Sequence, residues 1–157
     1  MNSRTQLVLF ASDELAFTLL DIVEQQIRLN KLHAALDTAS RITDATDWST
    51  AMEAIAVGQF RAGDKRGALN TANLIPHELN RNGVLMQIAF EQARSGHVQG
   101  AIETAGYIKA ALRRDAVLLG IALIRARAHD ISGALITTCH MGSELARARA
   151  NREIAHL

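Results

Sequence analysis

Apolar positions recur along this chain at a fixed interval of 33 residues, and in each interval they first mark one long helical face. Three neighbouring columns stand at i, i+3 and i+4, the spacing of residues that share one side of a helix. The columns are Leu19, Met52, Leu85, Leu118 and Asn151; Ile22, Ile55, Ile88, Ile121 and Ile154; and Val23, Ala56, Ala89, Ala122 and Ala155. Each interval therefore predicts one helix, which we call helix A.

A second helical face follows in each interval and is built from smaller residues. Its columns are Ala35, Ala68, Ala101 and Ala134; Ala39, Ala72, Ala105 and Thr138; and Ile42, Ile75, Ile108 and Met141. Small residues let two helix axes approach to about 8 Å, so we expect a closely packed helix B. The threonine column of this helix is Thr38, Thr71, Thr104 and Thr137. These hydroxyls are expected to donate back to the carbonyl four residues earlier.

The position between the two predicted helices is occupied by Asn30, Gly63, Gly96 and His129. Glycine and asparagine favour the left-handed conformation that ends many helices, and histidine is enriched there among the other residues. We therefore expect a left-handed residue after each helix A. The next position holds Lys31, Asp64, His97 and Asp130, and its two aspartates are expected to cap helix B.

The columns also predict the bounds of the helices and their assembly. A helices are expected at 13–29, 47–62, 80–95, 113–128 and 144–157, and B helices at 32–43, 65–76, 98–110 and 131–142. A single hairpin of this kind cannot bury its faces, so neighbouring hairpins must stack. The sequence predicts one all-α domain over 1–157, an α-solenoid of about four αα-hairpins with a capping helix at 144–157. Residues 1–12 are expected to form an N-terminal cap or a leftover helix.

Composition agrees with packed helices, and charge adds an asymmetry. Apolar residues make up 48% of the 157 residues, aromatic residues only 4%, and there is one proline. Such a composition favours helices over a sheet. The net charge of +1 provides no global field for nucleic acid or membrane. Residues 1–60 hold four Lys/Arg and eight Asp/Glu, and residues 61–157 hold thirteen and eight, so the two parts carry −4 and +5.

Several classes of protein are excluded by what the sequence lacks. It shows no signal peptide and no apolar run of about 18 residues, which predicts a cytoplasmic protein with no membrane partner. A periplasmic location stays open if a signal segment has been removed. The single cysteine, Cys139, rules out an internal disulfide and has no histidine or acid placed to activate it. With no metal-ligand spacing and no phosphate loop, we expect no enzyme activity, no metal and no cofactor.

The repeated unit resembles the tetratricopeptide repeat, whose pattern runs Trp-x2-Leu-Gly-x2-Tyr, Ala-x3-Phe and Pro over 34 residues. In the second unit Ile55-Ala56 stands at the Leu-Gly pair, Gly63-Asp64 at the turn between helices and Ala68 at the alanine of the second helix. The departures, at the positions of Trp, Tyr, Phe and Pro, are Met52, Gln59, Ala72 and Asn80. The period is also one residue short. The resemblance implies a tetratricopeptide-like array over nearly the whole chain.

The same resemblance implies that the A helices line a concave, peptide-binding surface. Its edge would be the arginine column Arg28, Arg61, Arg94 and Arg127. Arginine suits bidentate contacts with carboxylates, although a cation near a helix C-terminus also stabilises the helix dipole. The floor would be Met86, Phe90, Leu119 and Leu123, which alternatively pack as core between A helices. A basic end would be formed by Arg149, Arg152 and His156.

These features favour a protein-interaction scaffold that binds a peptide or an amphipathic segment with acidic residues. The opposite charges of the two parts keep open a self-associating, head-to-tail module and therefore a homo-oligomer. Binding to nucleic acid ranks below both, because the total charge is near neutral and aromatic residues for base stacking are scarce.

Overall fold

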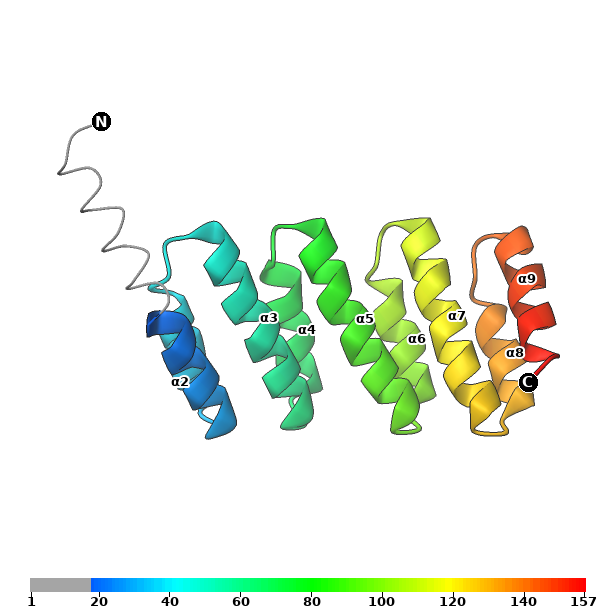
Figure 1. The fold of residues 1–157 in the computed structure, drawn as a ribbon, viewed down its shortest axis with the longest axis horizontal. Coiled ribbons are helices and arrows are strands. Elements are labelled where there is room, and N and C mark those ends of the chain that lie inside the picture. Colours follow the sequence, from blue (N-terminus) through cyan, green and yellow to red (C-terminus); the bar gives the residue numbers. More distant parts are fainter. Residues whose placement is uncertain (1–17) are drawn as a thin grey trace, which may run out of the picture. The chain divides into compact units, whose positions relative to one another are not determined.

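The structure, a computed structural model, describes residues 18–157, and every regular element in that range is a helix. The helices are residues 18–28, α2 (Leu32–Ala39), α3 (Ala45–Arg61), α4 (Lys65–Leu74), α5 (Glu78–Arg94), α6 (Val98–Gly106), α7 (Ala111–Arg127), α8 (Ile131–Thr138) and α9 (Glu144–Ile154) (Figure 1). The all-α prediction is confirmed. The cap or leftover helix predicted at 1–12 lies outside the described residues. No helix within 18–157 combines the length and hydrophobicity needed to cross a bilayer.

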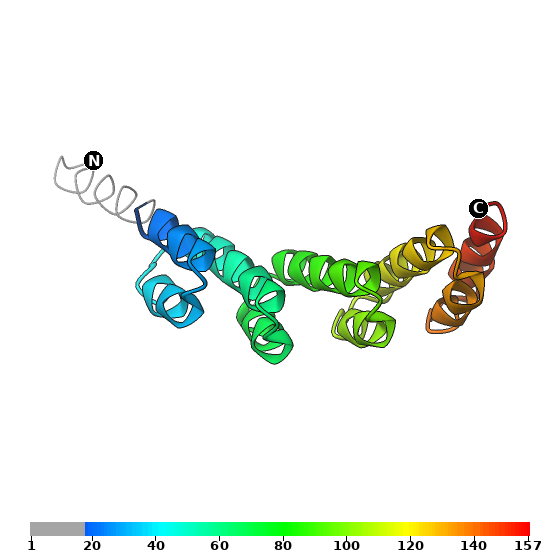
Figure 2. The same cartoon turned by 90° about the horizontal axis from the view of Figure 1, so that it is seen from below.

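The chain divides between Arg81 and Asn82 into two compact units. Within the first unit, α3 packs against α2 and α4, and within the second, α7 packs against α6, α8 and α9. Figure 2 shows two layers in the second unit, with α5, α7 and α9 in one and α6 and α8 in the other. In both units long A helices alternate with short B helices, as α3 and α7 have 17 residues each whereas α2 and α8 have 8.

The left-handed turns predicted after the A helices are confirmed. Asn30, Gly63, Gly96 and His129 have φ of 55°, 90°, 80° and 63°. In the second of these turns the Asp64 N–H donates to the Gln59 carbonyl (2.9 Å) and the Gly63 N–H to the Phe60 carbonyl (3.0 Å). This pair of bonds is the Schellman motif, which satisfies carbonyls left open at a helix end. A glycine at this position avoids the steric cost that a Cβ atom adds.

Both predicted aspartate caps are present at the starts of B helices. Asp64 Oδ1 accepts the Gly67 N–H and Asp130 Oδ1 accepts the Gly133 N–H, each at 2.8 Å. Arg125 additionally donates to Asp130 Oδ2 through Nε, at 2.9 Å, and through Nη2. The Arg125 hydrogen bonds first, and the Gly133 N–H second, lower the pKa of Asp130 below its ordinary value of 3.8.

The lowered pKa of Asp130 predicts a stability that depends on pH. A carboxyl whose pKa is lower in the folded state stabilises the fold above its unfolded pKa, and this contribution disappears as pH falls through the folded pKa. Asp130→Asn should therefore unfold at a lower urea concentration than the wild type at pH 7, with the gap closing below about pH 3.8. Asp64→Asn is the control, since Gln59 stands where Arg125 stands, and its gap should be smaller. A gap at Asp130 that does not change with pH would contradict the ion-pair argument.

The isoleucine column of helix A is buried, with one exception. Ile55, Ile88, Ile121 and Ile154 are at most 2% exposed. Ile22 was expected in the same core but is 41% exposed, so the prediction is wrong there. In the chain a helix B precedes each helix that carries the other members, whereas among the described residues no helix precedes the one that carries Ile22. Ala155 is exposed as well, because α9 ends at Ile154 instead of continuing to 157.

The B helices end earlier than the columns predict. Ile42, Ile75, Ile108 and Met141 were assigned to these helices but lie in the segments that follow them. They remain buried all the same. At Ile75 the backbone is extended (φ −68°, ψ 116°) and Pro76 follows, so the helix cannot continue. An apolar side chain three residues past a helical contact can thus return to the core from a loop.

Buried polar residues bond in two ways, of which only one was predicted. Thr137 Oγ1 donates to the Gly133 carbonyl at 2.8 Å, the expected bond to the fourth preceding residue. Thr104 Oγ1 instead donates to Gln92 Oε1 at 2.8 Å and joins α6 to α5. In the last hairpin Thr138 Oγ1 donates to Asn151 Oδ1 at 2.7 Å. Both residues stand where the other members of their columns are apolar. Their side chains bond to each other, so each polar group has a hydrogen-bond partner in the other.

A buried carboxylate fixes the start of α9 in the second unit. Asp115, the fifth residue of α7, accepts the Gly142 N–H through Oδ1 (2.9 Å) and the Ser143 N–H through Oδ2 (3.0 Å). Ser143 in turn caps α9, since its Oγ accepts the Ala146 N–H at 3.2 Å. The start of α7 and the start of α9 are therefore held together by side-chain bonds across 27 residues of chain.

Candidate functional site

Six of the predicted residues lie on two faces of the second unit. Met86, Phe90 and Arg94 follow each other at intervals of four on α5, and Leu119, Leu123 and Arg127 do the same on α7. Residues four apart lie on one side of a helix, so each helix presents two apolar side chains followed by an arginine at its last turn. Both arginines are exposed. Each helix thus carries, on one side, two residues predicted for the floor and one arginine predicted for the edge, and their role in peptide binding stays a prediction.

The two faces meet where Phe90 covers Gly120. A Cβ atom built on Gly120 would lie 2.6 Å from two ring carbons of Phe90. The ring therefore lies against the backbone of α7, which only glycine allows at this distance. Glycine inside a helix costs about 1 kcal/mol relative to alanine, and here it makes room for an aromatic side chain. Sequence reasoning missed Gly120, although an isolated glycine inside a helix is itself a signal of close approach.

Not all four apolar side chains are equally available. Met86 is 41% exposed, whereas Phe90, Leu119 and Leu123 are half-buried. Leu123 packs against a cluster made of Ala122, Ala126, Ala134 and Ile154. Leu123 thus belongs partly to the core, as the alternative interpretation of this set held. The accessible apolar surface is centred on Met86 and the outer side of the Phe90 ring.

The remaining arginine positions lie elsewhere in the fold. Arg28 and Arg61 belong to the first unit and are exposed at the ends of their helices. Arg28 Nη2 is 3.4 Å from Glu24 Oε2, an exposed ion pair within one helix turn that contributes little to stability. In the second unit Arg152 lies in the last turn of α9 and His156 follows it, both exposed. The predicted basic end of α9 is present as an exposed group with Arg149.

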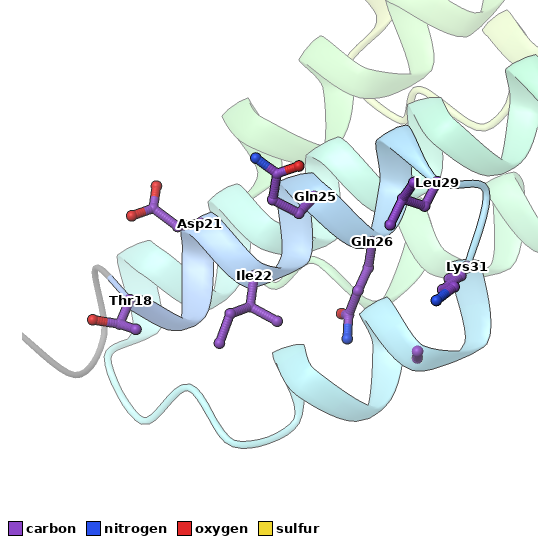
Figure 3. Close-up of a pocket in the computed structure, with 8 residues that line it drawn as sticks. Thr18, Asp21, Ile22, Gln25, Gln26, Leu29 and Lys31 are labelled. Atoms are coloured by element: carbon purple, nitrogen blue, oxygen red, sulfur yellow. The ribbon is translucent and has the colours of Figure 1, made fainter.

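A hollow that the sequence did not predict lies on the first hairpin, between the helix at 18–28 and α2 (Figure 3). It has a volume of about 400 Å³ and is lined by Thr18, Asp21, Ile22, Gln25, Gln26, Leu29, Lys31 and Ala34. Gln26 Oε1 is buried there without a hydrogen-bond partner. The hollow exists because Ile22 and Leu29 are left exposed. It contains none of the predicted site residues.

The described residues hold no group of metal ligands and one free cysteine. Between residues 18 and 157 no three histidine, cysteine or acidic side chains come close enough to hold a metal ion. Cys139 is exposed, and its Sγ lies 3.5 Å from the Leu135 carbonyl, the contact of a side chain turned back on its own helix. What the second unit offers is a surface of apolar and cationic side chains.

Comparison with known proteins leaves the resemblance to tetratricopeptide repeats as a prediction. No family model matches the chain, no curated protein matches its sequence, and no solved structure matches its fold. The function is therefore inferred from the surface of the helices alone.

Proposed function

We propose that this chain is a tetratricopeptide-like α-solenoid of 33-residue hairpins that binds an amphipathic peptide segment with acidic residues. The binding surface is the face of α5 and α7 that carries Met86, Phe90, Arg94 and Arg127. The repeat part of the proposal is supported by four left-handed turn residues spaced 33 apart, each followed by a short helix. The binding part is supported by the composition of that face.

The observation that carries the proposal is the partial exposure of Met86 together with two exposed arginines, Arg94 on the same side of α5 and Arg127 at the end of α7. Met86 leaves a flexible apolar side chain in water, and methionine adapts to partners of different shape. On each helix the arginine follows the first apolar residue by about two turns and the second by about one turn. Arg94 and Arg127 can each make two parallel bonds to a carboxylate. A helix with one apolar and one acidic side fits this arrangement.

The test is a selection of helical peptides of about 16 residues from a display library, a length of about 24 Å that matches the helix face. Selected peptides should be amphipathic and acidic. Arg94→Glu combined with Arg127→Glu should weaken their binding about tenfold or more, because two attractive contacts become repulsive. Met86→Asp should weaken it as well. Dissociation constants measured by fluorescence anisotropy provide the readout.

A matched control changes the same charges on another surface. Lys65 and Arg66 are exposed at the start of α4 in the first unit, and Lys65→Glu with Arg66→Glu should leave peptide binding unchanged. If both double variants bind alike, or if the selection returns peptides without acidic residues, the proposed surface is wrong.

A further inference from the structure

Two leucines in the second unit are among the most exposed apolar residues of the described chain. Leu112 is 84% exposed and Leu145 is 77% exposed. Each is the second residue of an A helix, Leu112 in α7 and Leu145 in α9, and they stand 33 residues apart in equivalent positions. Single exposed leucines are common on protein surfaces and need no explanation. The residues around these two leucines indicate that both belong to one surface.

The two leucines lie on one edge of the unit. Asp115 is one turn after Leu112 and accepts the backbone N–H of Ser143, which is two residues before Leu145. The same carboxylate accepts the Gly142 N–H, so the two helix starts are held side by side by two bonds. Figure 1 shows the starts of α7 and α9 on the same side of the unit. Both leucines therefore belong to a fixed surface and not to two independent loops.

Cationic side chains and a tyrosine stand close to the leucines in the chain, at or near the same helix starts. We define the Leu112–Leu145 edge by Tyr107, Lys109, Leu112, Arg113, Leu145 and Arg149. All six residues are exposed. Tyr107 stands at the end of α6, and Lys109 and Arg113 flank the start of α7. Arg149 is four residues after Leu145, on the same side of α9.

Acidic groups near the edge do not cancel its charge. The Asp115 carboxylate is buried and occupied by two backbone N–H groups. Glu144 Oε1 is 3.7 Å from Arg147 Nη2, so this acid has a cation of its own that is not counted in the edge. Lys109, Arg113 and Arg149 thus leave the edge positively charged, which calls for an anionic partner.

We propose that the Leu112–Leu145 edge binds the surface of a membrane that contains anionic lipids. The leucines protrude singly from helix starts, and a protein partner would need a fitted pocket for each of them. The boundary between lipid headgroups and acyl chains accepts protruding apolar side chains without such a fit. Tyrosine is favoured at that depth, and lysine and arginine extend their charged ends toward the headgroups. This binding would be peripheral, without a spanning helix, and it would revise the sequence prediction of no membrane partner. It goes beyond the proposed peptide surface without depending on it.

Vesicle co-sedimentation tests the proposal on the full chain. The probe is a phosphatidylcholine vesicle with about one third phosphatidylserine, compared with phosphatidylcholine alone. The wild type should sediment with the anionic vesicles and remain in solution with the neutral ones. Leu112→Glu combined with Leu145→Glu should reduce the partition coefficient about tenfold or more, and Arg113→Glu with Arg149→Glu should do the same. Salt that shortens the Debye length to about 3 Å should release the protein.

Matched controls separate this edge from the rest of the unit. Ile131 is an exposed apolar residue at the start of α8, and Ile131→Glu should leave vesicle binding unchanged. It lies near the far end of α7, about 25 Å along that helix from Leu112. Arg94→Glu with Arg127→Glu should also leave vesicle binding unchanged, so a failure of the peptide surface does not affect this test. Circular dichroism should show that the exposed leucine variants keep their helices.

Three results would overturn the proposal. One is a wild type that does not sediment with anionic vesicles. Another is a double leucine variant that sediments as well as the wild type, since attraction of charges elsewhere on the chain would then explain the binding. The third is a Leu112→Glu and Leu145→Glu variant that still binds vesicles but no longer binds the selected acidic peptides. That outcome would assign the edge to a protein partner.

Discussion

Ile121→Ala should lower the free energy of unfolding by about 3–4 kcal/mol. Ile121 is completely buried on α7, and replacing a buried isoleucine with alanine costs about 2–5 kcal/mol through lost burial and the cavity left behind. The middle of this range is expected because other buried positions of α7 hold small residues, Ala122 and Ala126 among them. Small side chains cannot move into the space that Ile121 leaves. Urea denaturation followed by far-ultraviolet circular dichroism measures the loss.

The same substitution at Ile22 is the matched control for Ile121. Both residues occupy the isoleucine column of helix A, but Ile22 is 41% exposed and borders an open hollow. Ile22→Ala should therefore cost less than about 1 kcal/mol, because little apolar area returns to water and no closed cavity forms. Equal losses for the two variants would mean that the isoleucine column is covered in the first hairpin as it is in the others, and the account of the hollow would fail.

Local features of the sequence were enough to predict the turns and the existence of the helices. Gly63 and Gly96 mark left-handed residues because the preference for positive φ belongs to the residue itself. Asp64 and Asp130 cap their helices because a short carboxylate reaches N–H groups within its own first turn. In each case the cause lies within a few residues of the position, so the column pattern reveals it.

Burial and close packing that depend on another segment of the chain could not be predicted from the sequence in the same way. The space over Gly120 is decided by the Phe90 ring, which reaches it from α5. Ile75 has the spacing of a helical contact, yet its burial comes from an extended segment that turns back to the core. Ile22 has the same identity as its column partners and differs only in what covers it. A single sequence shows the conformational preference of each residue, whereas its burial depends on the helix or segment that packs against it.

The two candidate surfaces also differ in whether the sequence could predict them. Arg94 and Arg127 were found as members of a repeated column, and Met86 was named because the tetratricopeptide resemblance implies that the A helices line a groove. The Leu112–Leu145 edge escaped notice because both leucines lie outside the core columns, and an apolar residue in a helix gives no sign of its exposure. The bonds from Asp115 that hold the edge together connect residues 27 and 28 positions apart. An acidic residue near the start of a helix would otherwise be explained by the helix dipole alone.

Asp115→Ala should lower the free energy of unfolding by about 2 kcal/mol. Hydrogen bonds to a charged group contribute about 1.5–3 kcal/mol each, and the variant loses two of them. A loss smaller than the sum of two such bonds is expected because Gly142 is exposed and Ser143 is half-exposed, so water can replace the carboxylate at their N–H groups. Asp115→Asn should fall between the variant and the wild type, since one oxygen of the amide still accepts while its NH₂ group faces the second donor. Urea denaturation gives the order.

Hydrogen exchange shows whether the loss arises at the start of α9. In Asp115→Ala the amides of Gly142 and Ser143 should exchange faster than in the wild type, while amides in the middle of α7 keep their relative protection. Glu103→Ala is the control, because Glu103 is exposed and only accepts a bond from Gln99 Nε2 at 3.2 Å; it should change neither stability nor exchange. If Asp115→Ala matched this control, the carboxylate would not hold α9 in place. Since the same two bonds align Leu112 with Leu145, a loosened α9 start should also weaken anionic vesicle binding in a variant whose leucines and cations are all intact.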